Sequence, residues 1–273
     1  MSNVDSIQSD KNPLLTGLSI LVTRPTGQAS SLIELLQQQG ARVLHQPSLK
    51  ITPFSNPDQQ TLIDNIADFA LLIFISRNAV EHGCQLINSQ QTLDKNRPVA
   101  AIGKATHHAL CEQGFTQIIS PQQGFDSEAL LASKSLNNDN ISTKSILIIR
   151  GGQGRELLKA TLEQRNANVS YLDVYQRQPE TPVLSSPDYE SLDIVTVSSQ
   201  QGLESLIDML PPDTQQTVLG KRLITPSSRC SNRAKELGFN QIETAANASD
   251  NAMLSCIVDK ITNSNRADIN NND

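Results

Sequence analysis

Arginines and glycines follow an apolar segment of this sequence in a pattern suited to binding anions. Arg150, Gly151 and Gly152 come directly after the isoleucine-rich residues 146–149, and Arg155 lies just beyond them. Glycine lets a backbone turn tightly and approach a ligand closely, and arginine offers paired N–H donors to a carboxylate. An amphipathic segment at residues 156–164 predicts a helix, whose first amides would also attract an anion. A turn that needs glycine for its own geometry, with arginines in local ion pairs, would give the same pattern.

The same arrangement occurs earlier in the chain. Arg24 follows the apolar residues 20–22, and a helix and a second strand are predicted after it. Three further segments have counterparts: residues 74–78 with 196–200, residues 112–118 with 236–242, and residues 126–131 with 250–254. Aligned in this way, Ser76 stands opposite Ser198. The paired segments occur in the same order in both halves of the chain, and each pair is separated by nearly the same number of residues. This pattern indicates a duplicated array of βα units.

Hydroxyl side chains stand where several predicted helices begin. Ser76, Ser198 and Ser199 each follow an apolar strand, so they can cap the next helix or contact a ligand. The two copies differ at one such place, because Pro226 stands where the alignment puts Gly103 in the first copy. The backbone there cannot approach a ligand as closely, and neighbouring hydroxyl groups would have to compensate.

The alternation of strands and helices, with no tight hairpins, predicts an α/β protein with parallel sheets. Proline-rich linkers near residues 46–53 and 174–182 lie at equivalent points of the two copies. We therefore expect two similar domains of parallel sheet flanked by helices, joined by a two-strand hinge, with an interdomain cleft. Residues 17–46 plus 180–262 form the first domain, residues 47–175 the second, and residues 1–16 and 263–273 are expected to be disordered tails.

Composition narrows the possible functions. The net charge of −6 argues against a nucleic-acid surface. The sequence has no apolar run long enough to span a membrane and no signal peptide, so a cytoplasmic protein is expected. Its four cysteines lack metal-ligand spacing and are expected to be buried thiols, and the four histidines are expected to be structural or surface residues, so no metal site is predicted.

Five motifs, taken together and in order, resemble the uroporphyrinogen-III synthase family. They are LVTRP at residues 21–25, ISRNAV at 75–80, AIGKAT at 101–106, IRGGQGR at 149–155 and VYQR at 174–177. The resemblance covers about residues 18–261 and implies a cofactor-free lyase that cyclises hydroxymethylbilane, inverting ring D and releasing water. It also implies no nucleic-acid or membrane partner, and we expect a monomer that can receive its substrate from hydroxymethylbilane synthase.

The resemblance also implies which residues form the site. Tyr175 matches the family's tyrosine and would assist the departure of the hydroxyl group, although a tyrosine bonded within the hinge is the plain alternative. The residues expected to bind the substrate are Thr23, Arg24, Ser76, Arg77, Asn78, Gly103, Thr106, Arg150, Gly151, Gly152, Arg155, Ser198, Ser199, Ser227 and Ser228.

Two other readings compete with this one. A dinucleotide-binding enzyme would need a third small residue after Gly152 and Gly154, but position 157 is leucine. A non-catalytic two-lobed binding protein for an anionic small molecule would show the same duplication and linkers. Such proteins are usually exported, and the sequence predicts no export signal.

Overall fold

The computed structural model describes residues 13–121, 124, 126–152 and 156–270. The chain divides into two compact units, unit 1 from the described residues of Met1–Lys50 and Gln178–Asp273, and unit 2 from Ile51–Arg177. The chain passes between the units twice, within the strands β3 (Leu49–Pro53) and β8 (Asn168–Pro179). The breaks between the units, Lys50/Ile51 and Arg177/Gln178, compare with expected linkers near residues 46–53 and 174–182.

Unit 2 is built on a sheet of six strands in the order β3-β8-β7-β4-β5-β6. From β8 to β6 every neighbouring pair is parallel. Besides β3 and β8, the strands are β4 (Leu71–Phe74), β5 (Val99–Ala101), β6 (Ile118–Ile119) and β7 (Ser145–Gly151). The helices are α2 (Gln60–Asp64), α3 (Arg77–Asn88), α4 (Lys104–Glu112), α5 (Ser127–Leu131), α6 (Asn138–Ile141) and α7 (Leu157–Gln164), with 3-10 turns at Pro57–Gln59, Ile66–Asp68 and Lys134–Leu136.

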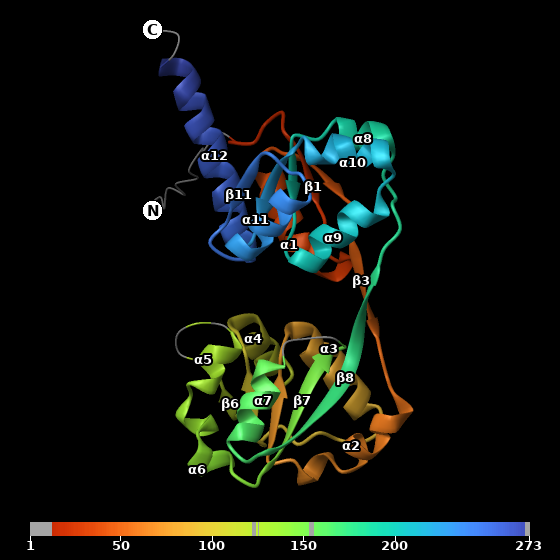
Figure 1. Ribbon diagram of the computed structural model, residues 1–273, viewed down its shortest axis with the longest axis vertical. Coiled ribbons are helices and arrows are strands. Elements are labelled where there is room, and N and C mark those ends of the chain that lie inside the picture. The colour runs from red at the N-terminus through yellow and green to blue at the C-terminus, as the bar shows by residue number, and fades with distance from the viewer. Residues whose placement is uncertain (1–12, 122–123, 125, 153–155, 271–273) are drawn as a thin grey trace, which may run out of the picture. The chain divides into compact units, whose positions relative to one another are not determined.

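Both faces of this sheet are covered, as Figure 1 shows. Leu147 and Ile149 of β7 pack toward α3 and α4, while Ile146 and Ile148 pack toward α5, α6 and α7. Burial on both faces explains why residues 146–149 form an unbroken apolar run instead of an alternating one.

Unit 1 is built on a sheet of five parallel strands in the order β11-β10-β9-β1-β2. Its strands are β1 (Ser19–Val22), β2 (Arg42–His45), β9 (Ile194–Thr196), β10 (Arg222–Thr225) and β11 (Ile242–Thr244). Its helices are α1 (Ser30–Gln38), α8 (Ser186–Glu190), α9 (Gln200–Met209), α10 (Pro212–Leu219), α11 (Ser228–Glu236) and α12 (Asp250–Asn270), with a 3-10 turn at Thr26–Gln28. α1 and α12 pack on one face, and α8, α9, α10 and α11 on the other.

Apart from the extra edge strand β3 in unit 2, the two sheets have the same strand order, and each combines strands of both copies. β4, β5 and β6 occupy the places that β9, β10 and β11 occupy in unit 1, and β7 and β8 the places of β1 and β2. The sheet of unit 1 thus joins the beginning of the first copy to the end of the second. The expectation of two similar α/β domains with parallel sheets is confirmed.

The C-terminal helix differs from the expectation. α12 continues to Asn270, so residues 263–270 are helical although a tail was expected to begin at residue 263. The segment from Asp250 to Asn270 contains neither glycine nor proline, so nothing in its sequence stops the helix after residue 262. The polar composition that suggested a tail does not exclude a helix.

Candidate functional site

The carboxyl ends of β4, β5 and β7 bring polar groups to one edge of the sheet in unit 2. Ser76 follows β4 and caps α3, with its Oγ accepting the Ala79 N–H at 3.0 Å. Gly103 occupies the N-cap position of α4 with an extended backbone, and as a glycine it has no side chain to cap the helix. The first turns of α3 and α4 carry amides that the helices themselves cannot satisfy. This edge therefore suits an anionic ligand.

Tyr175 is aimed by an irregularity in the pairing of β7 with β8. The register moves from Arg150 beside Asp173 to Gly151 beside Tyr175, so Val174 is the extra residue of a bulge. Bulges turn the side chains that follow them, and here both Val174 and Tyr175 are buried in the same core. A Cβ on Gly151 would lie 2.3 Å from ring carbons of Tyr175, so glycine is needed opposite the ring.

The Tyr175 hydroxyl is held by two side chains. Its oxygen lies 3.1 Å from the Oγ of Ser76 and accepts a hydrogen bond from Nη2 of Arg177 at 3.0 Å. The ring is fully buried and lies 5.8 Å, centroid to centroid, from the ring of His82. Sequence reasoning missed Arg177 as a site residue. The signal was present, because residues two apart on a strand point to the same face.

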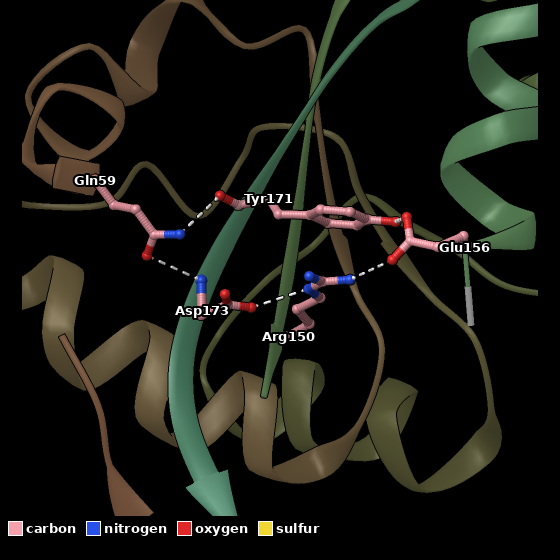
Figure 2. Close-up of polar contacts among 5 residues, drawn as sticks. All are labelled: Gln59, Arg150, Glu156, Tyr171 and Asp173. Atoms are coloured by element: carbon pink, nitrogen blue, oxygen red, sulfur yellow. Dashed lines mark hydrogen bonds and ion pairs between the residues drawn. The ribbon is translucent and has the colours of Figure 1, made fainter. Parts of the chain in front are cut away.

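Arg150 is already engaged by Asp173 and Tyr171 of β8 and by Glu156, which directly precedes α7, as Figure 2 shows. Its Nε donates to Asp173 at 2.9 Å and its Nη1 to Glu156 at 3.3 Å. Its guanidinium carbon lies 3.4 Å from the ring centroid of Tyr171, whose hydroxyl donates to Glu156 at 2.9 Å. The Arg150 side chain is only 14% exposed. In this structure Arg150 therefore forms local ion pairs and is not available as an unpaired cation.

Arg150, Glu156 and Tyr171 shift one another's pKa values. Burial lowers the pKa of Arg150, but the hydrogen bonds with Asp173 and Glu156 more than offset it, so the pKa is raised. Hydrogen bonds from Tyr171 and Arg150 lower the pKa of Glu156. Burial, with the Glu156 hydrogen bond, raises the pKa of Tyr171 to about 12. A pocket of about 310 Å³ adjoins the group and is lined by Ile75, Ile102, Asp126, Ser127, Ile148, Arg150, Leu158 and Tyr171.

The remaining expected residues of unit 2 differ in their accessibility. Arg77 is exposed and bonded to Glu81 at 2.8 Å, and that bond contributes most to raising its pKa. Asn78 is half-buried in the first turn of α3, and Thr106 is buried in the first turn of α4. Gly152 has a φ of +44°, which favours glycine. Arg155 lies outside the described residues.

Unit 1 presents a corresponding edge. The Thr23 hydroxyl is buried and donates to the carbonyl of Thr196 at 2.8 Å, so it is committed to the sheet. Arg24 is paired with Asp250 and also donates to the carbonyl of Ala248. As at Arg150, the arginine near the carboxyl end of the strand pairs with a carboxylate.

The helix caps correct the expected alignment of the two copies. Ser199, not Ser198, caps α9 by accepting the Gly202 N–H at 3.0 Å, and it therefore corresponds to Ser76. Ser198 is half-buried just before it. Ser227 caps α11, so the counterpart of Gly103 is Ser227 rather than Pro226. Ser228 is exposed in the first turn of α11.

The cysteines are not all buried as expected. Cys84 and Cys230 are buried, Cys256 is half-buried, and Cys111 is exposed. Burial raises the pKa of the Cys84 thiol and raises that of Cys230 to about 11, which makes both thiols poor nucleophiles. Within the described residues, no group of three or more His, Cys, Asp or Glu side chains is placed to hold a metal ion. Among the same residues, no helix is long and apolar enough to cross a membrane.

Comparison with known proteins places these features in a family. The family model described as "Uroporphyrinogen-III synthase HemD" matches residues 30–255. The uroporphyrinogen-III synthase of Escherichia coli (strain K12) is 32% identical over 246 residues, which cover 87% of this chain and 98% of that protein. The synthase of Salmonella typhimurium is 32% identical over 250 residues, with the same shares covered.

Solved structures show the same fold. A mutant uroporphyrinogen III synthase from the extremely thermophilic bacterium Thermus thermophilus aligns with a TM-score of 0.58 at 13% identity, covering 90% of this chain and 99% of that one. The enzyme from Helicobacter pylori 26695 aligns with a TM-score of 0.57 at 14% identity, covering 89% and 98%. At these identities the likeness concerns the fold alone.

Proposed function

We propose, because this chain belongs to the uroporphyrinogen-III synthase family, that it cyclises hydroxymethylbilane to uroporphyrinogen III with inversion of ring D and loss of water. The reaction breaks the bond from carbon to the terminal hydroxyl, leaves a cation on the chain of pyrroles, and joins the two ends of that chain. The protein must therefore hold a flexible polycarboxylate, assist the departing hydroxyl, and keep water from the cation.

The observation that carries the proposal is the placement of the Tyr175 hydroxyl. It lies in unit 2, within hydrogen-bonding distance of Ser76, which caps α3 at the carboxyl edge of the sheet. A neutral phenol donates a proton or a hydrogen bond without first needing to be charged. We therefore assign Tyr175 as the group that assists loss of the hydroxyl.

The carboxylates of the substrate would be held by helix-start amides, hydroxyl groups and arginines at the carboxyl edges of the sheets. In unit 1 the proposed contacts are Thr23, Arg24, Ser198, Ser199, Ser227 and Ser228, and in unit 2 they are Ser76, Arg77, Asn78, Gly103, Thr106, Arg150, Gly151, Gly152 and Arg155. Arg24 and Arg150 would exchange their present carboxylate partners for those of the substrate. Thr23 would act through the backbone it anchors, because its buried hydroxyl donates to the carbonyl of Thr196. Thr106 would contact a carboxylate through its hydroxyl.

We also propose how the protein works in the cell: its cofactor requirement, oligomeric state, location and source of substrate. The protein works without a cofactor, as a monomer in the cytoplasm, and receives hydroxymethylbilane from hydroxymethylbilane synthase. Gel filtration at working concentration, together with a titration of that synthase onto this protein followed by light scattering, would test the monomer and the transfer.

The activity is tested with freshly prepared hydroxymethylbilane. The purified protein is incubated with it, the product is oxidised, and the isomers of uroporphyrin are separated by chromatography. Formation of isomer III well above the protein-free control supports the proposal. Formation of isomer I alone, at the rate without protein, rejects the enzyme, and tight binding of the substrate without isomer III would indicate the non-catalytic binding protein.

A further inference from the structure

Arg177 is the residue that the geometry adds to the site. It is exposed, yet its Nη2 donates to the buried Tyr175 oxygen at 3.0 Å, and its guanidinium carbon lies 5.3 Å from the centroid of that ring. An exposed arginine is normally hydrated or paired with a carboxylate. Here a charged donor is directed at a neutral phenol on the same strand, two residues away.

The donors and acceptors around the phenol determine where its proton points. Arginine only donates, so in this bond the Tyr175 oxygen is the acceptor. The phenolic proton is then left for the Oγ of Ser76, 3.1 Å away, or for a ligand beside it. The Ser76 oxygen already accepts the Ala79 N–H, and the serine hydroxyl can rotate and donate in return.

We infer that Arg177 is a positioning residue for Tyr175: it fixes the phenol as acceptor on one side, so that the phenolic proton is presented to the departing hydroxyl of the substrate. This inference rests on the proposed function. It assigns Arg177 no contact with the substrate. To the capping of α3 and the proposed substrate contact it adds, for Ser76, the role of hydrogen-bond partner to the Tyr175 hydroxyl.

The step balances in atoms and charge. The bond from carbon to the hydroxyl oxygen breaks, its electron pair leaves with the oxygen, and the Tyr175 proton completes a water molecule. The substrate is left as a cation and Tyr175 as a phenolate, which the Arg177 guanidinium and the Ser76 hydroxyl stabilise by hydrogen bonds. After the ring closes, the macrocycle loses one proton, and the phenolate takes it up.

A double-mutant cycle tests the inference. The variants are Tyr175→Phe, Arg177→Gln, both together, and Arg177→Lys, with Arg42→Gln as a matched control at an exposed arginine of unit 1. The rate of isomer III formation is measured for each, with the melting temperature as a check on folding. Because Arg177→Gln removes a hydrogen bond from a charged donor, it should lower the rate of isomer III formation roughly tenfold to a hundredfold when Tyr175 is present.

In the Tyr175→Phe background the same Arg177→Gln change should alter the rate by less than about twofold, because the oxygen on which Arg177 acts is gone. Arg177→Lys, which keeps a charge and a donor, should recover part of the rate. Arg42→Gln should match the wild type.

Each other outcome is decisive. An equal loss from Arg177→Gln in both backgrounds would mean that Arg177 acts on the substrate or the fold, and the inference fails. An unchanged rate for Arg177→Gln also overturns it, while isomer III made by the wild type would leave the proposed cyclisation intact. An unchanged rate for Tyr175→Phe overturns the inference and the assignment of Tyr175 together. A wild-type protein that makes no isomer III removes both.

Discussion

Gly151 and Tyr175 lie opposite each other across the register shift between β7 and β8, and the absence of a side chain on Gly151 makes room for the Tyr175 ring. The ring would meet a Cβ at 2.3 Å, which is closer than packed atoms allow. Gly151, the last residue of β7, was expected from the sequence to contact a ligand, and the structure gives it a packing role beside Tyr175.

Substituting alanine for Gly151 should therefore displace the Tyr175 ring. Overpacking of this kind costs about 1–3 kcal/mol of unfolding free energy, and the displaced hydroxyl should also slow turnover. Gly27→Ala is the matched control, because a Cβ there meets nothing within 4 Å. Urea denaturation and the isomer assay measure the two effects. Unchanged stability in Gly151→Ala would show that the ring can shift without strain.

Tyr189 provides a comparison for the loss of a tyrosine hydroxyl. Its ring is 1% exposed, and within the described residues its hydroxyl has no hydrogen-bond partner. Because an unpaired buried hydroxyl carries a desolvation cost, Tyr189→Phe should raise the unfolding free energy by about 1 kcal/mol. Tyr175→Phe removes a hydroxyl with two partners and should lower it. Equal effects of the two changes in chemical denaturation would contradict this.

The Glu156 carboxylate makes the stability of unit 2 depend on pH. Its pKa is lowered by the hydrogen bonds from Tyr171 and Arg150, so its stabilising effect is present above its ordinary value of 4.5 and is lost as the pH falls through the lowered value. Glu156→Gln should therefore melt below the wild type at pH 6, and the difference between the two melting temperatures should shrink as the pH falls below 4.5. Glu34→Gln, an exposed change on α1, is the control. A constant difference at all pH values would disprove the linkage.

Gln46 anchors the chain where it returns to unit 1. Its side chain is fully buried, donates to the carbonyl of Thr181 at 3.1 Å, and accepts the N–H groups of Val183 at 2.6 Å and Leu184 at 3.2 Å. Gln46→Ala leaves these backbone groups without partners and should lower the unfolding free energy by roughly 3 kcal/mol. Gln38→Ala, on the exposed face of α1, should change it little. Hydrogen exchange at Val183 and Leu184 would locate the loss.

The sequence predicted the architecture well because the pattern of each strand is local. Residues 146–149 are apolar throughout, which indicated a strand covered on both sides. The similarity between the segments around Arg24 and Arg150 indicated two similar domains. The alignment between copies was one residue off at Ser198. A run of two serines does not show which of them will cap α9, since that depends on where the helix begins.

The site was less predictable, because its main contacts depend on pairing between strands. Nothing in the sequence marks Val174 as the extra residue of a bulge, and without that bulge the positions of Tyr175 and Gly151 cannot be related. The partners of Arg150 are likewise set by packing, since Asp173 comes from the neighbouring strand. Arg177 was within reach, because it shares a strand face with Tyr175.

The composite sheets also govern how the chain assembles as it is made. Unit 2 occupies one continuous segment and is complete once Arg177 has been synthesised, whereas β1 of unit 1 must wait for β9, with Leu21 pairing beside Val195. Domains generally fold as units during synthesis. β1 and β2 therefore emerge first from the ribosome and can pair with each other, but β1 gains its second neighbour only when β9 has been made. A chain that ends after unit 2 leaves that edge of β1 exposed and unpaired.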